Sequence, residues 1–305
     1  MNANDGTTCN RIESQKSICE ETMQMVVVAC LSVLLSGSSA LAQKASVETY
    51  TAEELQQHFL NVAGNYKMVV DQTQLKLRPQ PLMYWQNPVR KQEQGALFAW
   101  LKNGRPAAMG SIFTYGADEG TVCRHEMISL ADAPLESRLN GVVVWAPDTP
   151  GLKWQPVIPS ISPAITPTRR LTQMRSIARS FDGLLYEPGG QISKLTLIPQ
   201  PVLRYESPEA GVVDGAVFSL AVATDPEIFL VLEAQKDNTG KVDWHFATAR
   251  SHFYALELNR NGERVWQVES VPELLLTDAA QKPWMNAPYF IFFESQPLPA
   301  PETLR

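Results

Sequence analysis

The sequence predicts an α+β fold built from two tandem units, each a helix followed by an antiparallel β-meander. The first observation is an internal duplication of about 120 residues, because shifting the chain by 120 positions aligns residues 75–125 with residues 195–245 without a gap. That alignment holds 13 identities in 51 positions, where unrelated sequences would give roughly three. The second observation is that a helix signal precedes each window and period-two apolar spacing fills it. We therefore expect two similar units packed about a pseudo-twofold axis.

The repeated positions are mostly prolines, glycines and apolar residues, with one histidine. In the first window they are Leu75, Leu77, Pro79, Gln80, Pro81, Pro88, Gly95, Ala96, Phe98, Pro106, Gly120, Val122 and His125. The conserved spacing of these turn and core residues is what predicts the same strand order in both windows.

The first unit is expected to cover residues 43–146. Thr51 and Glu54 form a capping-box pattern, and Gly64 supplies a stop after the apolar residues that follow at helical spacing. Turn signals such as Asn103-Gly104 then separate short segments with period-two apolar spacing. Strands are expected at residues 75–77, 82–85, 96–101, 109–115, 122–130 and 142–145.

The second unit, residues 168–270, follows a proline-rich linker at residues 147–167. Thr168 is expected to cap its helix, whose apolar face continues to Phe181 and which ends near Gly183. Strands are expected at residues 195–197, 202–205, 216–223, 228–233 and 244–251. Segment 228–232 is apolar at every position, which predicts burial on both sheet faces. Residues 271–305 are expected to form a tail that contains a docking strand at residues 289–293.

An apolar run of 11 residues, 25–35, is too short to span a bilayer and has the length of a signal-peptide core. Ala40-Leu41-Ala42 fits a cleavage site before Gln43, so we expect a secreted or periplasmic protein. The 24 residues ahead of the run are net acidic, and a start at Met23 or Met25 would remove them.

The composition is that of an ordinary globular protein, with 44% hydrophobic and 19% charged residues. The net charge is −6, and the expected signal peptide, residues 1–42, takes away two basic and four acidic groups and leaves −4. This mildly acidic body gives no reason to expect nucleic acid as a partner. Cys123 is the only cysteine after residue 42, so the mature chain is expected to lack a disulfide, and it shows no transmembrane segment.

The repeated histidine is the most interesting polar position, although the signal for catalysis is weak. Residues two apart on a strand share a face, which places Cys123 beside His125 and Asp243 beside His245. A Cys-His pair can activate a thiol, and an Asp-His pair can orient a general base. The alternative is that each histidine makes a structural hydrogen bond and that Cys123 is a small buried hydrophobe. No catalytic motif and no metal-ligand spacing is found, so neither a metal nor a cofactor is expected.

Ligand-binding candidates come from basic and aromatic residues. Arg175 and Arg179 give the second helix a basic flank that can hold an anion, with a solvated helix face as the alternative. Trp100, beside a turn, is the best exposed candidate for stacking, and Trp154 in the linker is expected near the junction of the two units. We expect this junction to be lined by strand 228–232, and to be either a pocket with an arginine as anchor or a closed apolar seam.

Several strings of the chain resemble a family of uncharacterised exported bacterial proteins with no assigned activity. They are GALFAWLKNGRPAAMGSIF, RHEMISL, RRLTQMRSIARSF and LIPQPVLRYE, followed by DGAVF and TDPE. The resemblance covers most of the chain after residue 42 and implies export and a shared fold. It implies no catalytic residue, because the family has none assigned.

Two functions from different classes therefore stay open. The first is a non-catalytic ligand-binding or interaction module whose partner is a small molecule, a peptide or a protein. The second is a hydrolase or thiol-dependent enzyme that uses Cys123 with His125. Fast alkylation of the Cys123 thiol would favour the enzyme, and a buried, slowly reacting thiol would exclude it.

Overall fold

The computed structural model describes residues 50–87, 92–117, 120–271 and 285–298. The chain divides into two units, Met1–Val47 and Glu48–Arg305, and all of the described residues belong to the second. The predicted signal peptide lies outside the described residues. None of the helices in the described segments is long and apolar enough to cross a membrane.

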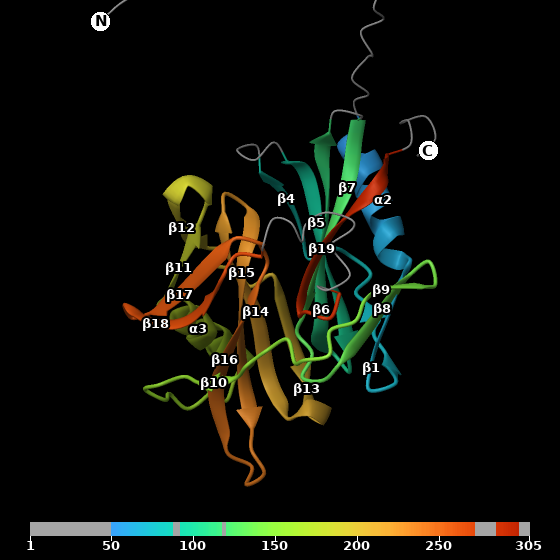
Figure 1. Ribbon diagram of the computed structural model, residues 1–305. Helices are drawn as coiled ribbons and strands as arrows, with labels where there is room; N and C mark the ends of the chain where they lie inside the picture. The colour runs from blue at the N-terminus through green and yellow to red at the C-terminus, as the bar shows by residue number, and fades with distance from the viewer. Residues whose placement is uncertain (1–49, 88–91, 118–119, 272–284, 299–305) are drawn as a thin grey trace, which may run out of the picture. The chain divides into compact units, whose positions relative to one another are not determined.

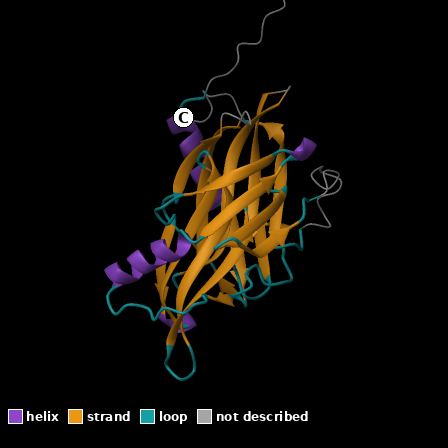
Figure 2. Ribbon diagram, turned by 90° about the vertical axis from the view of Figure 1, so that its left-hand side faces the viewer, coloured by secondary structure: helices purple, strands orange, loops and turns teal. Residues whose placement is uncertain are grey.

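Strands make up most of the described chain (Figure 2). Nineteen strands stand against two α-helices of 13 and 12 residues in the described segments. The predicted α+β fold of two helix-plus-meander repeats is therefore wrong: the protein is mostly β-sheet, and one sheet curls into a half-barrel. In a meander, each strand pairs with the next strand along the chain. In the nine-stranded sheet of this protein, β11 (Phe181–Tyr186) also pairs with the distant β17 (Ala255–Arg260).

The first helix, α2 (Ala52–Gly64), begins with the capping box predicted from the sequence. Thr51 Oγ1 accepts a hydrogen bond from the Glu54 backbone N–H at 3.2 Å, and the Glu54 carboxylate accepts one from the Thr51 N–H at 2.9 Å. The buried face of α2 packs in one core with Phe98 and Trp100. A four-stranded sheet adds to this core; its strands are β1 (Tyr66–Val70), β2 (Thr73–Gln74), β8 (Leu135–Leu139) and β9 (Val142–Trp145), in the order β2-β1-β8-β9.

A six-stranded antiparallel sheet has the order β19-β7-β6-β5-β3, with β4 paired to β5. Its strands are β3 (Lys76–Leu77), β4 (Met83–Asn87), β5 (Gln92–Lys102), β6 (Arg105–Ala117), β7 (Gly120–Ser129) and β19 (Tyr289–Pro297). The C-terminal strand β19 pairs antiparallel with β7 and places Tyr289 opposite Ile128. A segment 161 residues away in the sequence, counted from Ile128 to Tyr289, thus forms one edge of this sheet.

The second helix, α3 (Pro167–Ala178), has Thr166 at its N-cap position rather than Thr168 as predicted, and the Thr166 side chain makes no capping hydrogen bond. Pro167 takes the first helical position, where its fixed φ suits the helix and its missing N–H leaves no bond unmade. The helix also ends before Phe181, which begins β11. The nine-stranded sheet has the order β10-β16-β15-β14-β12-β11-β17-β18 with β13 on β14. Its remaining strands are β10 (Gln155–Pro156), β12 (Ile192–Leu197), β13 (Leu203–Ser207), β14 (Val212–Val222), β15 (Asp225–Lys236), β16 (Val242–Arg250) and β18 (Glu263–Val268).

The six-stranded and nine-stranded sheets pack face to face, with the helices on their other faces (Figure 1). The alternation of side chains along β15 shows this arrangement. Leu230 packs in the core that contains α3, whereas Phe229 and Val231 pack against Leu97 and Met109 of the facing sheet. The continuous apolar segment 228–232 is buried on both sides of the sheet, as predicted.

Candidate functional site

Cys123 and His125, the predicted catalytic candidates, both lie inside the core. Each has an exposed fraction of 0%. The His125 Nδ1 atom is hydrogen-bonded to the Tyr66 hydroxyl at 2.5 Å, and the ring of Phe292 lies 4.5 Å from the His125 ring centroid. Neither the thiol nor the imidazole reaches solvent, so no substrate has access to this pair.

Asp243 and His245 lie on β16, and no hydrogen bond between their side chains is found within the described segments. The Asp243 carboxylate instead pairs with Lys241 Nζ at 2.6 Å and accepts a hydrogen bond from the Ser160 hydroxyl at 3.4 Å. The His245 Nδ1 atom is buried without a partner in the described residues. The carboxylate therefore does not orient the imidazole as a general base would require.

The helix arginines lie away from the junction between the facing sheets. Helix α3 packs on the other face of the nine-stranded sheet, so Arg175 and Arg179 cannot serve as anchors in that junction. Arg175 donates a hydrogen bond to the Gln200 side chain, and Arg179 is exposed beyond the last turn. The junction itself is filled by apolar side chains such as Phe229 and Met109, which matches the closed seam rather than the open pocket.

The two tryptophan candidates differ in exposure. Trp100 is 1% exposed and packs in the core with α2, so the expectation of an exposed stacking residue is wrong. Its side chain points inward because even-numbered positions of β5 face that core. Trp154 is half-buried at the margin of the junction, where the Arg105 guanidinium lies 5.2 Å above its ring.

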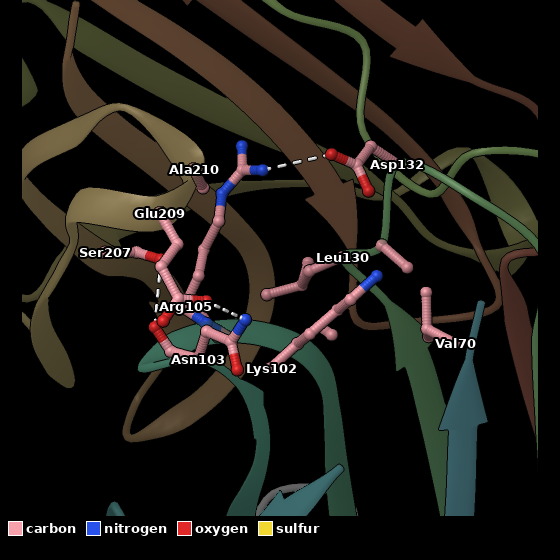
Figure 3. A pocket seen from close by; sticks show the side chains of 12 residues that line it. Val70, Lys102, Asn103, Arg105, Leu130, Asp132, Ser207, Glu209 and Ala210 are labelled. Atoms are coloured by element: carbon pink, nitrogen blue, oxygen red, sulfur yellow. Dashed lines mark hydrogen bonds and ion pairs between the residues drawn. The ribbon is translucent and has the colours of Figure 1, made fainter. Parts of the chain in front are cut away.

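A cavity of about 270 Å³ lies beside Arg105, and we call it the hairpin cavity. It is formed by the turn between β5 and β6, the segment after β7, and the short 3-10 helix Pro208–Ala210 (Figure 3). Its lining consists of Val70, Lys102, Asn103, Arg105, Pro106, Ala107, Leu130, Ala131, Asp132, Ser207, Glu209 and Ala210. It is therefore a mixed cavity, with apolar walls and charged groups of both signs.

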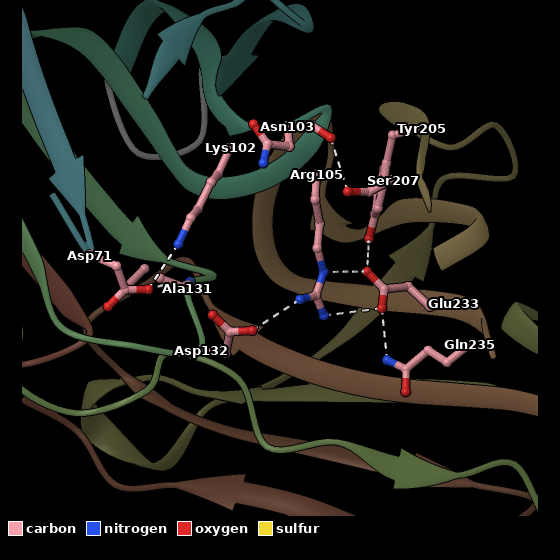
Figure 4. A network of polar contacts seen from close by, with 11 residues as sticks. Asp71, Lys102, Asn103, Arg105, Ala131, Asp132, Tyr205, Ser207, Glu233 and Gln235 are labelled. Atoms are coloured by element: carbon pink, nitrogen blue, oxygen red, sulfur yellow. Dashed lines mark hydrogen bonds and ion pairs between the residues drawn. The ribbon is translucent and has the colours of Figure 1, made fainter. Parts of the chain in front are cut away.

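The Arg105 guanidinium is held in place by a buried carboxylate of the facing sheet (Figure 4). Arg105 Nε donates to Glu233 Oε1 at 2.8 Å, and Nη2 donates to Oε2 at 3.1 Å. Glu233 has an exposed fraction of 0% and accepts two further hydrogen bonds, from the Tyr205 hydroxyl and the Gln235 amide, both at 2.7 Å. Four donors thus compensate the buried negative charge.

The electrostatics of this group keep Arg105 charged. Burial alone would lower the pKa of Arg105, but the hydrogen bonds and the charge of Glu233 raise it above its ordinary value. Burial, together with the nearby Glu233 carboxylate, raises the pKa of Tyr205 well above its ordinary value. At neutral pH, Arg105 is therefore a cation and the Tyr205 hydroxyl is a hydrogen-bond donor.

The sequence fixes the hairpin turn at the cavity through Asn103-Gly104. These residues have φ values of 50° and 84°, as a two-residue turn between twisted strands requires. A Cβ atom on Gly104 would lie 2.7 Å from the Glu206 backbone oxygen, so only glycine allows this approach. The Ser207 hydroxyl then donates to the Asn103 carbonyl at 2.9 Å, and the Asn103 amide donates to Glu209.

The two cations that line the cavity, Arg105 and Lys102, also form ion pairs with exposed carboxylates. Arg105 Nη1 donates to Asp132 at 3.2 Å, and Lys102 Nζ pairs with Asp71 at 2.8 Å. The side chains of Asp132 and Asp71 are 66% and 58% exposed. The arrangement thus combines a fixed cation with outer partners that solvent screens strongly.

Sequence reasoning found the turn at Asn103-Gly104 and the strand that contains Glu233, but it missed the cavity. One signal was present: Glu233 directly follows a fully apolar buried segment, and a carboxylate in such a place needs a partner. Nothing in the sequence identifies Arg105, 128 residues earlier, as that partner.

No group of three or more metal-ligating side chains is found within the described residues. No protein-family model, no curated protein and no solved structure matches the chain. The resemblance to an exported family, drawn from the sequence, therefore stays a prediction.

Proposed function

We propose that this chain is a non-catalytic binding protein whose ligand is a small zwitterion, such as a free amino acid, in the hairpin cavity. The observation that carries the proposal is the Arg105 guanidinium, fixed by buried Glu233 on one edge and reaching exposed Asp132 from the other. A cation that is already ordered loses little freedom when a ligand carboxylate binds it. The proposal therefore assigns the ligand carboxylate to Arg105 Nη1 and Lys102.

A ligand carboxylate can replace the exposed ion-pair partners of Arg105 and Lys102 at little cost. Asp132 and Asp71 are more than half exposed, and surface ion pairs of this kind contribute only about 0–1 kcal/mol. A ligand carboxylate that replaces Asp132 at Arg105 therefore breaks little. Glu233 stays in place, because it is buried and accepts four hydrogen bonds.

The charge balance selects the class of ligand. Lys102 and Arg105 stand against the four carboxylates of Asp71, Asp132, Glu209 and Glu233, so the cluster has a net charge of −2. A ligand with two negative charges is repelled by this excess. A ligand with one carboxylate and one ammonium is favoured, because the displaced Asp132 and the exposed Glu209 can accept from the ammonium.

The size of the cavity supports a ligand of a few carbon atoms. Its volume of about 270 Å³ lies just below the ~300–1,000 Å³ of pockets for drug-sized ligands. The alternative of a thiol-dependent enzyme has weaker support, because Cys123 and His125 are both fully buried.

Export is a separate part of the proposal. The apolar run at residues 25–35 and the cleavage-site pattern Ala40-Leu41-Ala42 support it. The intact mass of protein recovered from the periplasm or medium should match a chain that begins at Gln43. Recovery of the full-length chain from the cytoplasm alone would contradict export.

Titration calorimetry with a panel of neutral amino acids tests the binding function. We expect the best of them to bind with a dissociation constant below about 1 mM, which corresponds to about −4 kcal/mol. Its amide and its N-acetyl derivative, which each lack one charge, should bind at least about tenfold weaker, and succinate weakest of all. The absence of saturable binding for every amino acid of the panel would contradict the proposal.

Three variants localise the effect. Lys102→Ala should weaken binding of the amino acid about fivefold, and Lys241→Ala, an exposed lysine with a surface ion pair away from the cavity, should not. Asp132→Asn removes the competing carboxylate at Arg105, so the N-acetyl derivative should bind this variant more tightly than it binds the parent. An equal loss in Lys102→Ala and Lys241→Ala would place binding elsewhere.

A further inference from the structure

A second cavity of about 260 Å³ lies at the edges of the facing sheets, and we call it the edge cavity. It opens where β16 and β18 of the curled sheet approach β7 and the start of β19. Ile128, Trp266, Val268 and Pro288 give it apolar walls, and Thr248 and Arg250 add polar groups from β16. None of these residues belongs to the hairpin cavity.

Arg250 is a cation with spare hydrogen-bond donors. Its Nε, Nη1 and Nη2 atoms donate to the backbone carbonyls of His252, Glu269 and Tyr254 at 2.8, 2.9 and 2.8 Å. A guanidinium has five N–H groups, so two remain after these bonds. Burial lowers the pKa of Arg250, whereas the nearby Tyr289 and Glu126 raise it, and the guanidinium carbon lies 5.1 Å from the centroid of the Tyr289 ring. No carboxylate within the described segments lies within ion-pair distance of Arg250, and Glu126 offsets its charge only from farther away.

Thr248 adds an unused hydroxyl next to this cation. Thr248 and Arg250 are two apart on β16 and share a face of the strand. The Thr248 side chain is 7% exposed, and its Oγ1 atom has no hydrogen-bond partner within the described residues. A buried hydroxyl without a partner is unfavourable, so an acceptor supplied by a ligand would relieve it.

We infer that the edge cavity binds a small monocarboxylate with an apolar body, such as an aromatic or short aliphatic acid. The carboxylate accepts from the spare N–H groups of Arg250 and from the Thr248 hydroxyl, while the body packs against Trp266 and Val268. The buried Glu126 carboxylate accepts the hydroxyl of Tyr289, which lines the cavity, at 2.8 Å, and its negative charge disfavours a ligand with two carboxylates.

Titration calorimetry with benzoate, phenylacetate and hexanoate tests this site in the chain that begins at Gln43. At least one of the three should bind saturably, and its neutral amide should bind at least about tenfold weaker, because Arg250 contributes through charge. No saturable binding of any of the three up to about 10 mM would overturn the inference. Equal affinity for the acid and its amide would overturn it as well.

Variants separate this site from the hairpin cavity. Thr248→Val has almost the same volume and should keep the fold while it weakens binding about three- to tenfold. Thr196→Val, an exposed strand position on β12, is the matched control and should bind as the parent does. Val268→Phe should fill the edge cavity and abolish binding of the monocarboxylate. Lys102→Ala changes only the hairpin cavity, so it should leave the affinity for the monocarboxylate unchanged. If Thr248→Val binds the monocarboxylate as tightly as the parent does, or if Lys102→Ala loses as much of this affinity as Thr248→Val, the ligand does not bind in the edge cavity. Either result overturns the inference, whatever the amino-acid titration shows.

Discussion

The guanidinium of Arg105 on β6 and the carboxylate of Glu233 on β15 form a two-bond ion pair at 2.8 and 3.1 Å that joins the two facing sheets. The pair lies at the end of an apolar junction formed by residues such as Met109 and Phe229. It fixes the hairpin between β5 and β6 relative to β15, and thereby fixes the position of the hairpin cavity. The ion pair is thus both a structural link and one wall of the proposed site.

Removal of Arg105 should destabilise the protein strongly. Arg105→Met leaves the Glu233 carboxylate buried without its countercharge, so the free energy of unfolding should fall by about 3–5 kcal/mol. Urea denaturation measures this loss. The double variant Arg105→Met with Glu233→Gln is the control, because it removes both charges and should regain part of the loss. A double variant as unstable as the sum of both single variants would contradict the ion-pair account.

Gly95 should not tolerate a side chain. A Cβ atom at this position would lie 2.3 Å from Trp85 Cε2, and the Trp85 indole cannot move freely because it is 2% exposed and donates to Ser111 at 2.9 Å. Gly95→Ala should therefore reduce the free energy of unfolding by about 1–3 kcal/mol. Gly64→Ala is the matched control, since an added Cβ meets nothing within 4 Å there. Similar urea midpoints for the two variants would show that the packing at Trp85 is wrong.

Stability should fall at alkaline pH, partly because of Tyr205. Burial and the Glu233 carboxylate raise the pKa of Tyr205 well above its ordinary value. The unfolded chain releases the tyrosyl proton near about pH 10, whereas the folded chain keeps it, so this contribution is complete below about pH 10 and is lost as the pH rises further. The urea midpoint of Tyr205→Phe should fall less steeply than that of the parent between about pH 9 and pH 11. Tyr84→Phe, at a tyrosine that is 44% exposed, should keep the parental slope.

The Cys123 thiol should react slowly in the folded protein. Its exposed fraction is 0%, so an alkylating reagent reaches it only when the surrounding core opens. Alkylation followed by mass spectrometry should be at least about 100-fold slower in buffer than in denaturant. Fast labelling of the native protein would contradict this packing and would favour the thiol-dependent enzyme over the binding module.

Local signals in the sequence predicted local structure well. The capping box at Thr51, the turn at Asn103-Gly104 and the strand β9 at residues 142–145 all lie where the sequence places them. Each depends on contacts within a few residues, such as a cap bond or a φ value that glycine allows. Prediction of this kind needs no knowledge of distant parts of the chain.

The fold class was wrong because several strands depend on distant partners. Strands β1, β8, β11 and β17 were not predicted, and the start of β11 was assigned to the end of a helix. Tyr66 of β1 pairs with Leu139 of β8, and Phe181 of β11 pairs with Arg260 of β17. These short strands alternate buried and more exposed residues over only five or six positions, which is a weak signal without knowledge of the pairing. The hairpin cavity was missed for the same reason, since Arg105 and Glu233 are 128 residues apart.

The most direct test of the proposed function is a nuclear magnetic resonance titration of the ¹⁵N-labelled protein with the best-binding amino acid. Binding in the hairpin cavity should cause saturable shifts of the backbone amides of Asn103, Ala131 and Asp132 and of the Arg105 Nε–H group, because these residues line the cavity. The amides around Thr248 in the edge cavity should not move. Saturable binding with shifts confined to residues away from Arg105, or no shifts at all, would contradict amino-acid binding in the hairpin cavity.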